Sequence, residues 1–291
     1  MEILQVAISG VAIGCIYGLV ALGFVLIYKA TEVVNFAQGD ILMVGGFVAY
    51  TFAVLFGLNF WLAVLLSVVV LALFGAAFER VVLRHLIGQP AFSAVMVTLG
   101  AAYAMRGLVT MVPGWGTDTH ALKTPFSEMF LRGGGLNVSA DHIAIIVSTA
   151  ALCGALFLLF KKTRVGIAMQ ASAQNQLAAY YVGIPVQHMQ TLIWAIAAAI
   201  AGFAAILLAP ITFVHNNMGF IALNAFPAAV VGGFGSIPGA LVGGLIIGVV
   251  ESLAGYLLPE GFKAVAPHVV VLTVLMIKPS GIFSAMRKKK V

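Results

Sequence analysis

The stretch ILQVAISGVAIGCIYGLVALGFVLIY, residues 3–28, contains no charged side chain. A helix needs roughly 20 apolar residues to cross about 30 Å of hydrocarbon, and this stretch exceeds that length. It is not preceded by a basic segment and is too long for the apolar part of a signal peptide. We therefore interpret it as the first membrane-spanning helix, retained in the protein.

The composition extends this interpretation to the whole chain. Of 291 residues, 62% are hydrophobic and 8% are charged, with a mean hydropathy of +1.12. A soluble domain carries about 25% charged residues, so lipid must surround most of this chain. In lipid the apolar runs must be helices, because an open strand leaves backbone groups without partners. The predicted fold is all-α: one transmembrane domain over residues 1–291, with eight or nine membrane helices, some of them short or broken. The runs lie at 3–28, 35–56, 60–78, 91–112, 142–160, 189–209, 221–235, 237–257 and 264–278.

The basic residues favour one orientation in the membrane. If the connection 161–188 is cytoplasmic and the runs alternate in direction, eleven of the 15 Lys and Arg residues lie on the cytoplasmic side. The N-terminus is then outside and the basic tail at 287–290 inside. Because the charges cluster between apolar runs, the net charge of +6 reflects topology, and we expect no nucleic-acid partner.

The run 221–235 is the shortest and spans only about 22 Å as a helix. Alternation requires a short or broken helix that reaches the cytoplasmic side. A re-entrant loop is the alternative, and it holds only if another run is also misassigned.

Polar residues interrupt the apolar pattern at 34–40, VNFAQGD. A carboxylate or amide at the start of a run can cap a helix N-terminus, where free N–H groups and the helix dipole favour it. Alternatively, a helix is broken near membrane depth and the segment lines a translocation pathway. The two roles are compatible. The candidate residues are Asn35, Phe36, Gln38, Gly39 and Asp40.

A second interruption covers 224–239, NAFPAAVVGGFGSIPG. Its proline removes a helix hydrogen bond, and the glycine cluster weakens helical continuity. Gly- and Pro-interrupted segments in both halves of a transporter point to a central pathway built from discontinuous helices. The candidate pathway residues here are Asn224, Pro227, Gly232, Gly233, Gly235, Pro238 and Gly239.

Glycines also recur four residues apart, which places them on one helix face and lets two helix backbones approach closely. Such a series predicts helix–helix packing or, alternatively, a gate that lines the pathway. The two series are Gly10, Gly14 and Gly18, and Gly235, Gly239 and Gly243.

Two ionisable residues lie well inside apolar runs, where such groups are a functional hypothesis by default. Glu251 is within two turns of the external end of its run, so we interpret it as reaching the interface. We expect Arg106 to extend outward along its apolar stem in the same way.

The connection 161–188, KKTRVGIAMQASAQNQLAAYYVGIPVQH, is polar, with helical propensity over 167–181. Gly183 and Pro185 would end that helix. A short helix on the cytoplasmic face predicts a docking element for a soluble partner, and a linker helix without a partner is the alternative.

Enzymatic signatures are missing from the sequence. It contains no GxxxxGK[ST] phosphate loop and no HExxH, CxxC or GxSxG motif. Its six histidines show no metal-ligand spacing. We expect no catalytic residue, no metal site and no cofactor in this chain.

Four segments resemble the branched-chain amino acid ABC permease family, in order and over essentially the whole chain. They are YGLVALGFVLIYKATEVVNFAQGDILMVGGF (17–47), TRVGIAMQASA (163–173) with its downstream Gly183, AVVGGFGSIPGALVGG (229–244) and IKPSGIF (277–283). The resemblance implies one half of a heterodimeric pore in a bacterial inner membrane. It implies a second, homologous permease, two cytoplasmic ATPases that bind ATP and Mg, and a periplasmic solute-binding protein.

The resemblance also implies roles for particular residues. The connection 161–188 becomes the coupling loop that seats in an ATPase groove, and Arg164, Gly166 and Gly183 match the loop pattern of the family. The segment 35–40 and the glycines at 232–239 become the two elements of the central pathway.

The chain departs from the family pattern at three places. An acidic residue is usual where Gln174 and Asn175 stand, so neutral hydrogen bonds would replace a salt bridge to the ATPase. Lys is common where Asn224 stands, and a small residue where Pro227 stands. These departures leave the solute open among branched-chain amino acids, urea, short amides and aromatic acids.

A stand-alone ion-coupled secondary transporter is the alternative of a different class. It normally needs ionisable groups deep in the membrane, and only Glu251 and Asp40 qualify. A membrane-embedded enzyme lacks any recognisable nucleophile here. The leading interpretation is a permease subunit of an ATP-driven importer for small amino acids or a similar polar solute.

Overall fold

The computed structural model describes residues 2–86, 88–127, 129–133, 136–259 and 261–283. Within them, seven helical segments are long and apolar enough to cross a membrane, and α9 and α11 are shorter apolar helices. The predicted all-α fold with eight or nine membrane helices is therefore confirmed. The helices are α1 (Glu2–Thr31), α2 (Gln38–Tyr50), α3 (Phe60–Val81), α4 (Ala91–Met111), α5 (Ala140–Lys162), α6 (Arg164–Gln174), α7 (Gln176–Tyr181), α8 (Val186–Thr212), α9 (Ile221–Gly232), α10 (Ile237–Leu257) and α11 (Phe262–Ile277). Shorter helical turns are η1 (Thr51–Leu55), η2 (Leu83–Leu86) and η3 (Met218–Phe220).

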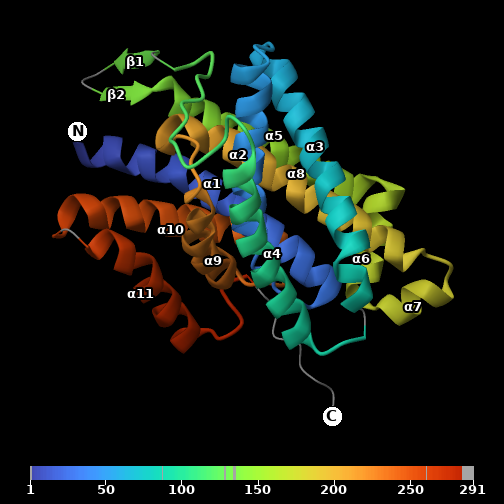
Figure 1. The fold of residues 1–291 in the computed structure, drawn as a ribbon. Coiled ribbons are helices and arrows are strands. Elements are labelled where there is room, and N and C mark those ends of the chain that lie inside the picture. The colour runs from blue at the N-terminus through green and yellow to red at the C-terminus, as the bar shows by residue number, and fades with distance from the viewer. Residues whose placement is uncertain (1, 87, 128, 134–135, 260, 284–291) are drawn as a thin grey trace.

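A small antiparallel hairpin, β1 (Phe130–Gly133) and β2 (Leu136–Ser139), lies in the connection between α4 and α5. The hairpin and α7 mark opposite ends of the molecule. Near the start of α1, Gln5 donates to the carbonyl oxygen of Asn137 in β2 at 2.7 Å. At the other end of α1, Gln176 of α7 donates to the carbonyl oxygen of Ala30 at 2.8 Å. Figure 1 shows α1 running between them, so we refer to the hairpin end and the α7 end.

The core is built around α1, whose residues 14–27 are all buried. A helix that is apolar on every side is expected inside a bundle rather than against lipid. Helices α3, α4 and α5 are buried only along one stripe and expose the remainder of their apolar surface. They form part of the apolar exterior of the described fold.

Helix α10 packs against α1 in the opposite direction through glycines. The backbone of Gly244 lies against Gly18, and that of Gly248 lies against Gly14, where an added Cβ would overlap the facing backbone. Gly10 lies farther along the same contact, beside Ser252. This close approach of two backbones is the packing geometry that small residues four apart permit. Gly243 faces the other way, against the carbonyl oxygen of Ala228 in α9.

Helix α2 begins deep inside the molecule. Its first residue, Gln38, lies against Gly23 of α1 and donates to the carbonyl oxygen of Ala197 in α8. Gly23 is about 12 Å from the α7 end of α1, and Ala197 about 17 Å from the start of α8, at about 1.5 Å per residue. Residues 32–37 therefore run back into the membrane without helical structure, and α2 completes the crossing from mid-depth.

The second interruption mirrors the first. After α8, Val214 pairs with His120 at the hairpin end, and the chain then returns to mid-depth, where Gly219 lies against Gly39. Helix α9 completes this crossing and ends at Gly232, followed by Gly233, whose φ is +92°. The following Phe234 packs against Tyr28 at the α7 end, with 4.9 Å between ring centres. The run 221–235 is thus part of a full crossing by a broken segment, as alternation of direction requires, and does not return to the end from which it came.

Candidate translocation cleft

A cleft of about 630 Å³ opens where the two interrupted crossings meet. Its walls come from α1, α2, α4, α9 and α11, and Figure 1 shows α4 and α9 in front of α1 at this place. The walls are mostly aromatic and aliphatic. The lining residues are Phe24, Phe36, Asp40, Leu99, Ala102, Tyr103, Arg106, Gly219, Phe220, Ala222, Leu223, Phe226, Pro227, His268, Val271 and Leu272.

Asp40 and Arg106 form an ion pair in this cleft. The Arg106 Nε donates to Asp40 Oδ1 at 2.5 Å, and Nη2 lies 3.5 Å from Oδ2. The guanidinium also lies 4.0 Å from the ring centre of Phe220 and 5.8 Å from that of Tyr103, distances at which the ring faces attract a cation. Asp40 sits in the first turn of α2, where the helix dipole favours a carboxylate.

The expectation that Arg106 extends outward is wrong. Its side chain turns inward because a carboxylate and two aromatic faces lie within reach, which compensates the charge locally. The sequence could have predicted this pair, because ionisable residues within membrane segments usually pair with one another. Asp40 and Arg106 have opposite charges and lie within the apolar runs 35–56 and 91–112.

The polar residues that precede Asp40 lie behind the wall of the cleft. Asn35 and Gln38 are fully buried. The Asn35 Oδ1 accepts from the N–H of Ala37 at 3.1 Å, and its Nδ2 donates to Gln38 Oε1 at 3.2 Å. Gln38 then donates to the main chain of α8. Asn35 thus braces the turn before α2, and Gln38 ties α2 to α8. Neither amide caps α2, because its N-cap residue, Ala37, makes no side-chain cap hydrogen bond.

Phe36 and Pro227 do line the cleft. The ring of Phe36 stacks on Phe226 of α9 with 6.2 Å between centres, and its N–H donates to Thr98 of α4 at 3.3 Å. Asn224 lies one turn before Pro227 but faces α1, where its amide is 3.4 Å from the hydroxyl of Tyr17. It is absent from the lining of the cleft.

The glycines at 232–239 form a tight turn at the α7 end, away from the cleft. Gly232 and Gly239 pack backbone to backbone, and Ser236 caps α10 by accepting from the N–H of Gly239 at 3.1 Å. Pro238 occupies the first turn of α10, where its missing N–H costs no hydrogen bond. The main chain of 282–283 closes over this turn by donating to Val231 and Gly232.

We expected Glu251 to reach the membrane interface, but the structure buries it. It is 6% exposed and lies beside Tyr17, and its Oε2 has no hydrogen-bond partner. The close glycine contact between α1 and α10 encloses the side chain before it can extend to the surface. Hydropathy alone could not have indicated this, because the partner helix is distant in sequence.

Comparison with known proteins identifies the family. Residues 6–278 match the family model described as the branched-chain amino acid transport system permease component. The chain is 31% identical to the high-affinity branched-chain amino acid transport system permease protein LivH of Escherichia coli, over 99% of this chain and 97% of that protein. It is also 31% identical to BraD of Pseudomonas aeruginosa, over 99% and 98%. The chain belongs to this permease family.

The fold of the permease is also found in a solved structure. PsaBC from Streptococcus pneumoniae in complex with Fab aligns with a TM-score of 0.50, over 96% of this chain and 93% of that chain, at 13% identity. The family match, and not this fold likeness, confirms the resemblance noted in the sequence over essentially the whole chain. The permease is a multi-pass membrane protein.

The connection 161–188 of the permease forms two short helices rather than the single one expected. Asn175 ends α6 and caps α7 by accepting from the N–H of Ala178 at 2.9 Å. Gly166, in the first turn of α6, packs against the end of α5, while Arg164 is exposed. Gly183 follows the two helices α6 and α7. Its φ is +85°, and an added Cβ there would meet no atom within 4 Å. Gln174 is exposed at the junction.

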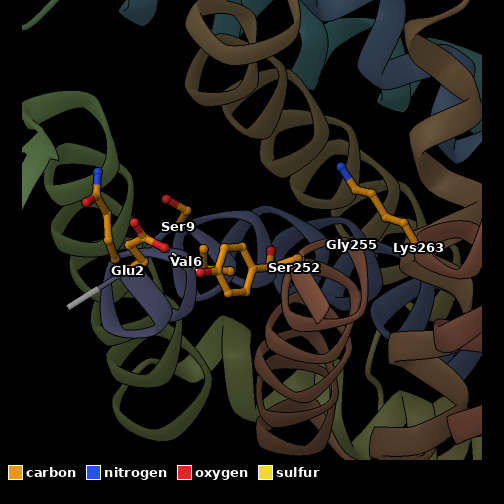
Figure 2. Close-up of a pocket in the computed structure, with 8 residues that line it drawn as sticks. Glu2, Val6, Ser9, Ser252, Gly255 and Lys263 are labelled. Carbon is orange, nitrogen blue, oxygen red and sulfur yellow. Dashed lines mark hydrogen bonds between the residues drawn. The ribbon is translucent and has the colours of Figure 1, made fainter. Parts of the chain in front are cut away.

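A second hollow of the permease, about 510 Å³, lies at the hairpin end between the start of α1, the end of α10 and the start of α11. In Figure 2, Glu2 and Ser9 line one part of it and Lys263 stands apart at the other. The hydroxyl of Tyr256 donates to Glu2 at 2.5 Å. In the described part of the chain, no three His, Cys, Asp or Glu residues lie close enough to hold a metal ion.

Proposed function

We propose that this chain is one of two pore-forming permease subunits of an ATP-driven importer for branched-chain amino acids. The observation that carries the proposal is the full-length match to the family, in which LivH and BraD are named for branched-chain amino acid transport. The geometry supports it, because broken helices meet at a cleft in the middle of the membrane, as in other transporters. Asp40, Phe36 and Pro227 contribute to the pathway, and the chain itself performs no catalysis.

The α7 end faces the cytoplasm in this proposal and seats a partner ATPase. Of the Lys and Arg residues that the structure describes, seven lie toward this end and four do not, which supports that orientation. The basic tail at 287–290, predicted to be cytoplasmic, lies outside the described residues. Helix α7 and the residue after it expose a cluster of large apolar side chains. Leu177 is 65% exposed, Tyr181 77% and Val182 76%. A groove of about 640 Å³ runs beside them along 176–188. Large exposed apolar patches of this kind mark interaction sites.

The second permease closes the cleft from the side. Helices α4 and α11 expose apolar residues around the opening of the cleft. Among them, the side chain of Tyr103 is 72% exposed and that of Leu272 is 63% exposed. A homologous partner would cover this surface and leave a path between the two subunits. The periplasmic solute-binding protein docks at the hairpin end, and ATP and Mg bind only to the ATPases.

Uptake and co-purification test the proposal together. Deletion of the gene should abolish uptake of radiolabelled leucine at low concentration, and the wild-type gene should restore it. The affinity-tagged chain should co-purify with two ATPase subunits and a second permease. A chain that purifies alone and imports its solute without ATP would be a secondary transporter, and the proposal would be wrong.

A further inference from the structure

Asp40 and Arg106 are the acidic and the basic residue of the cleft lining, which is otherwise apolar apart from Tyr103 and His268. Two opposite charges side by side in an apolar cleft match a solute that itself carries two opposite charges. We infer that Asp40 and Arg106 bind a zwitterionic amino acid during its passage, with the ammonium group on Asp40 and the carboxylate on Arg106. This inference rests on the proposed function and assigns the residues that recognise the solute.

The charge balance favours a zwitterion over other solutes. When a zwitterion enters the pair, the Asp40–Arg106 contact is exchanged for two contacts of the same kind, and no charge is left without a partner. A solute with one charge can satisfy only one of the two residues and leaves the other uncompensated in a poorly hydrated site. Because one set of ion pairs replaces another, the zwitterion is held without being trapped, as a transport pathway requires.

The Asp40–Arg106 pair differs from the Glu79–Arg84 ion pair in its additional hydrogen-bond partners. Glu79 and Arg84 are joined by Thr191, which accepts from Arg84 at 2.8 Å and donates to Glu79 at 2.7 Å. No third side chain hydrogen-bonds to Asp40 or Arg106 within the described part of the chain. The two cleft residues therefore retain unused donor and acceptor sites that face an open volume.

Neighbouring residues position the charged groups of Asp40 and Arg106 and form the apolar part of the site. The ring of Phe220 supports the Arg106 guanidinium from one face. Gly219 stands against Asp40, and an added Cβ there would lie 3.0 Å from Oδ1, so a side chain at this position would crowd the carboxylate. The stacked rings of Phe36 and Phe226 provide the surface for an aliphatic side chain.

The test measures ligand binding to the purified transporter complex by saturation-transfer NMR. The ligands are leucine, 4-methylpentanoate, which has only the carboxylate, and isopentylamine, which has only the ammonium group. Wild type should transfer saturation to the leucine methyl groups and at least tenfold less to either analogue. Asp40→Asn should shift this preference toward 4-methylpentanoate, and Arg106→Gln toward isopentylamine. A structural ion pair that only braces α2 against α4 would not produce opposite shifts.

A second measurement compares leucine binding and uptake in the double variant Asp40→Asn/Arg106→Gln with those in a matched control, Glu79→Gln/Arg84→Gln. The cleft double variant should lose the leucine signal and at least tenfold in leucine uptake, while the control pair keeps the leucine signal. Unchanged leucine binding in the cleft double variant, or the same ligand preference in both single variants, overturns the inference. If wild-type complex imports no branched-chain amino acid at all, the proposed function fails instead.

Discussion

Gly39 in the first turn of α2 lies directly against the carbonyl oxygen of Gly219, at the start of the helical segment η3–α9. The contact joins the N-terminal ends of two broken crossings that enter the membrane from opposite ends. Both helices point their positive dipole ends toward this junction, beside the carboxylate of Asp40. The junction therefore depends on two residues that have no side chain.

Gly39→Ala should separate the two segments. An added Cβ would overlap the carbonyl oxygen of Gly219 and the side chain of Ala222, so backbone must shift. Overpacking of this kind costs about 1–3 kcal/mol of folding free energy. We expect a lower thermal midpoint of the solubilised complex and reduced uptake. Gly154→Ala in α5 is the control, because no atom lies within 4 Å of its added Cβ, and it should leave both measurements near wild type. Equal effects of the two variants would contradict the proposed contact.

Gln38→Leu should destabilise the fold without changing which solute is bound. The substitution removes the donor to the carbonyl oxygen of Ala197 and the acceptor for Asn35, in a fully buried site. Leaving buried polar groups without partners costs about 1–3 kcal/mol. Gln170 also donates to a main-chain oxygen, that of Phe160, but is exposed, so Gln170→Leu should cost far less because water replaces the bond. Denaturation of the solubilised complex measures the difference, and an altered ligand preference in Gln38→Leu would assign Gln38 to the pathway.

The sequence predicted the membrane helices well because hydrocarbon allows few alternatives. An apolar run in lipid must be a helix, and its length and neighbouring charges determine whether it crosses. The interruptions at 34–40 and 224–239 were also visible, since polar residues, Gly and Pro are unusual in such runs. The sequence did not reveal that the two interruptions meet through Gly39 and Gly219, because that contact joins residues far apart in the chain.

The functional residues were harder to predict for the same reason. The sequence points to Asp40 but not to its partner Arg106, because Asp40 and the ring of Phe220 that hold Arg106 lie on other elements, α2 and η3. Asn224 was placed on the pathway by its position before Pro227, although the helix turns it toward Tyr17. The glycines at 232–239 were grouped with the pathway by composition, whereas their backbone packing forms the turn into α10. Which face a residue occupies depends on packing that hydropathy does not encode.

Asn175→Ala should weaken the proposed coupling between ATP hydrolysis and uptake. The Asn175 side chain caps α7, and loss of such a cap costs about 1 kcal/mol, a large amount for a helix as short as α7. The displaced α7 should seat poorly on the ATPase, so hydrolysis responds less to the solute-loaded binding protein. The control is Asn59→Ala, which removes the matching cap of α3 at the hairpin end. Full stimulation of ATPase activity in Asn175→Ala would contradict the proposed seat, as would unaltered stimulation in a variant that combines Arg164→Ala with Gly183→Ala.

The proposed orientation can be tested by cysteine labelling, because the two ends of the fold carry exposed residues outside the helices. Asp118 is exposed at the hairpin end, and Gln89 is exposed at the α7 end in the connection between α3 and α4. Each is replaced by cysteine in a background in which Cys15 and Cys153 are replaced by alanine. A membrane-impermeant maleimide should label Asp118→Cys in intact spheroplasts and Gln89→Cys only after lysis. The excess of basic residues at the α7 end makes this orientation the favourable one. Labelling of Gln89→Cys from outside would invert the topology, and an ATPase could then not seat on α6 and α7.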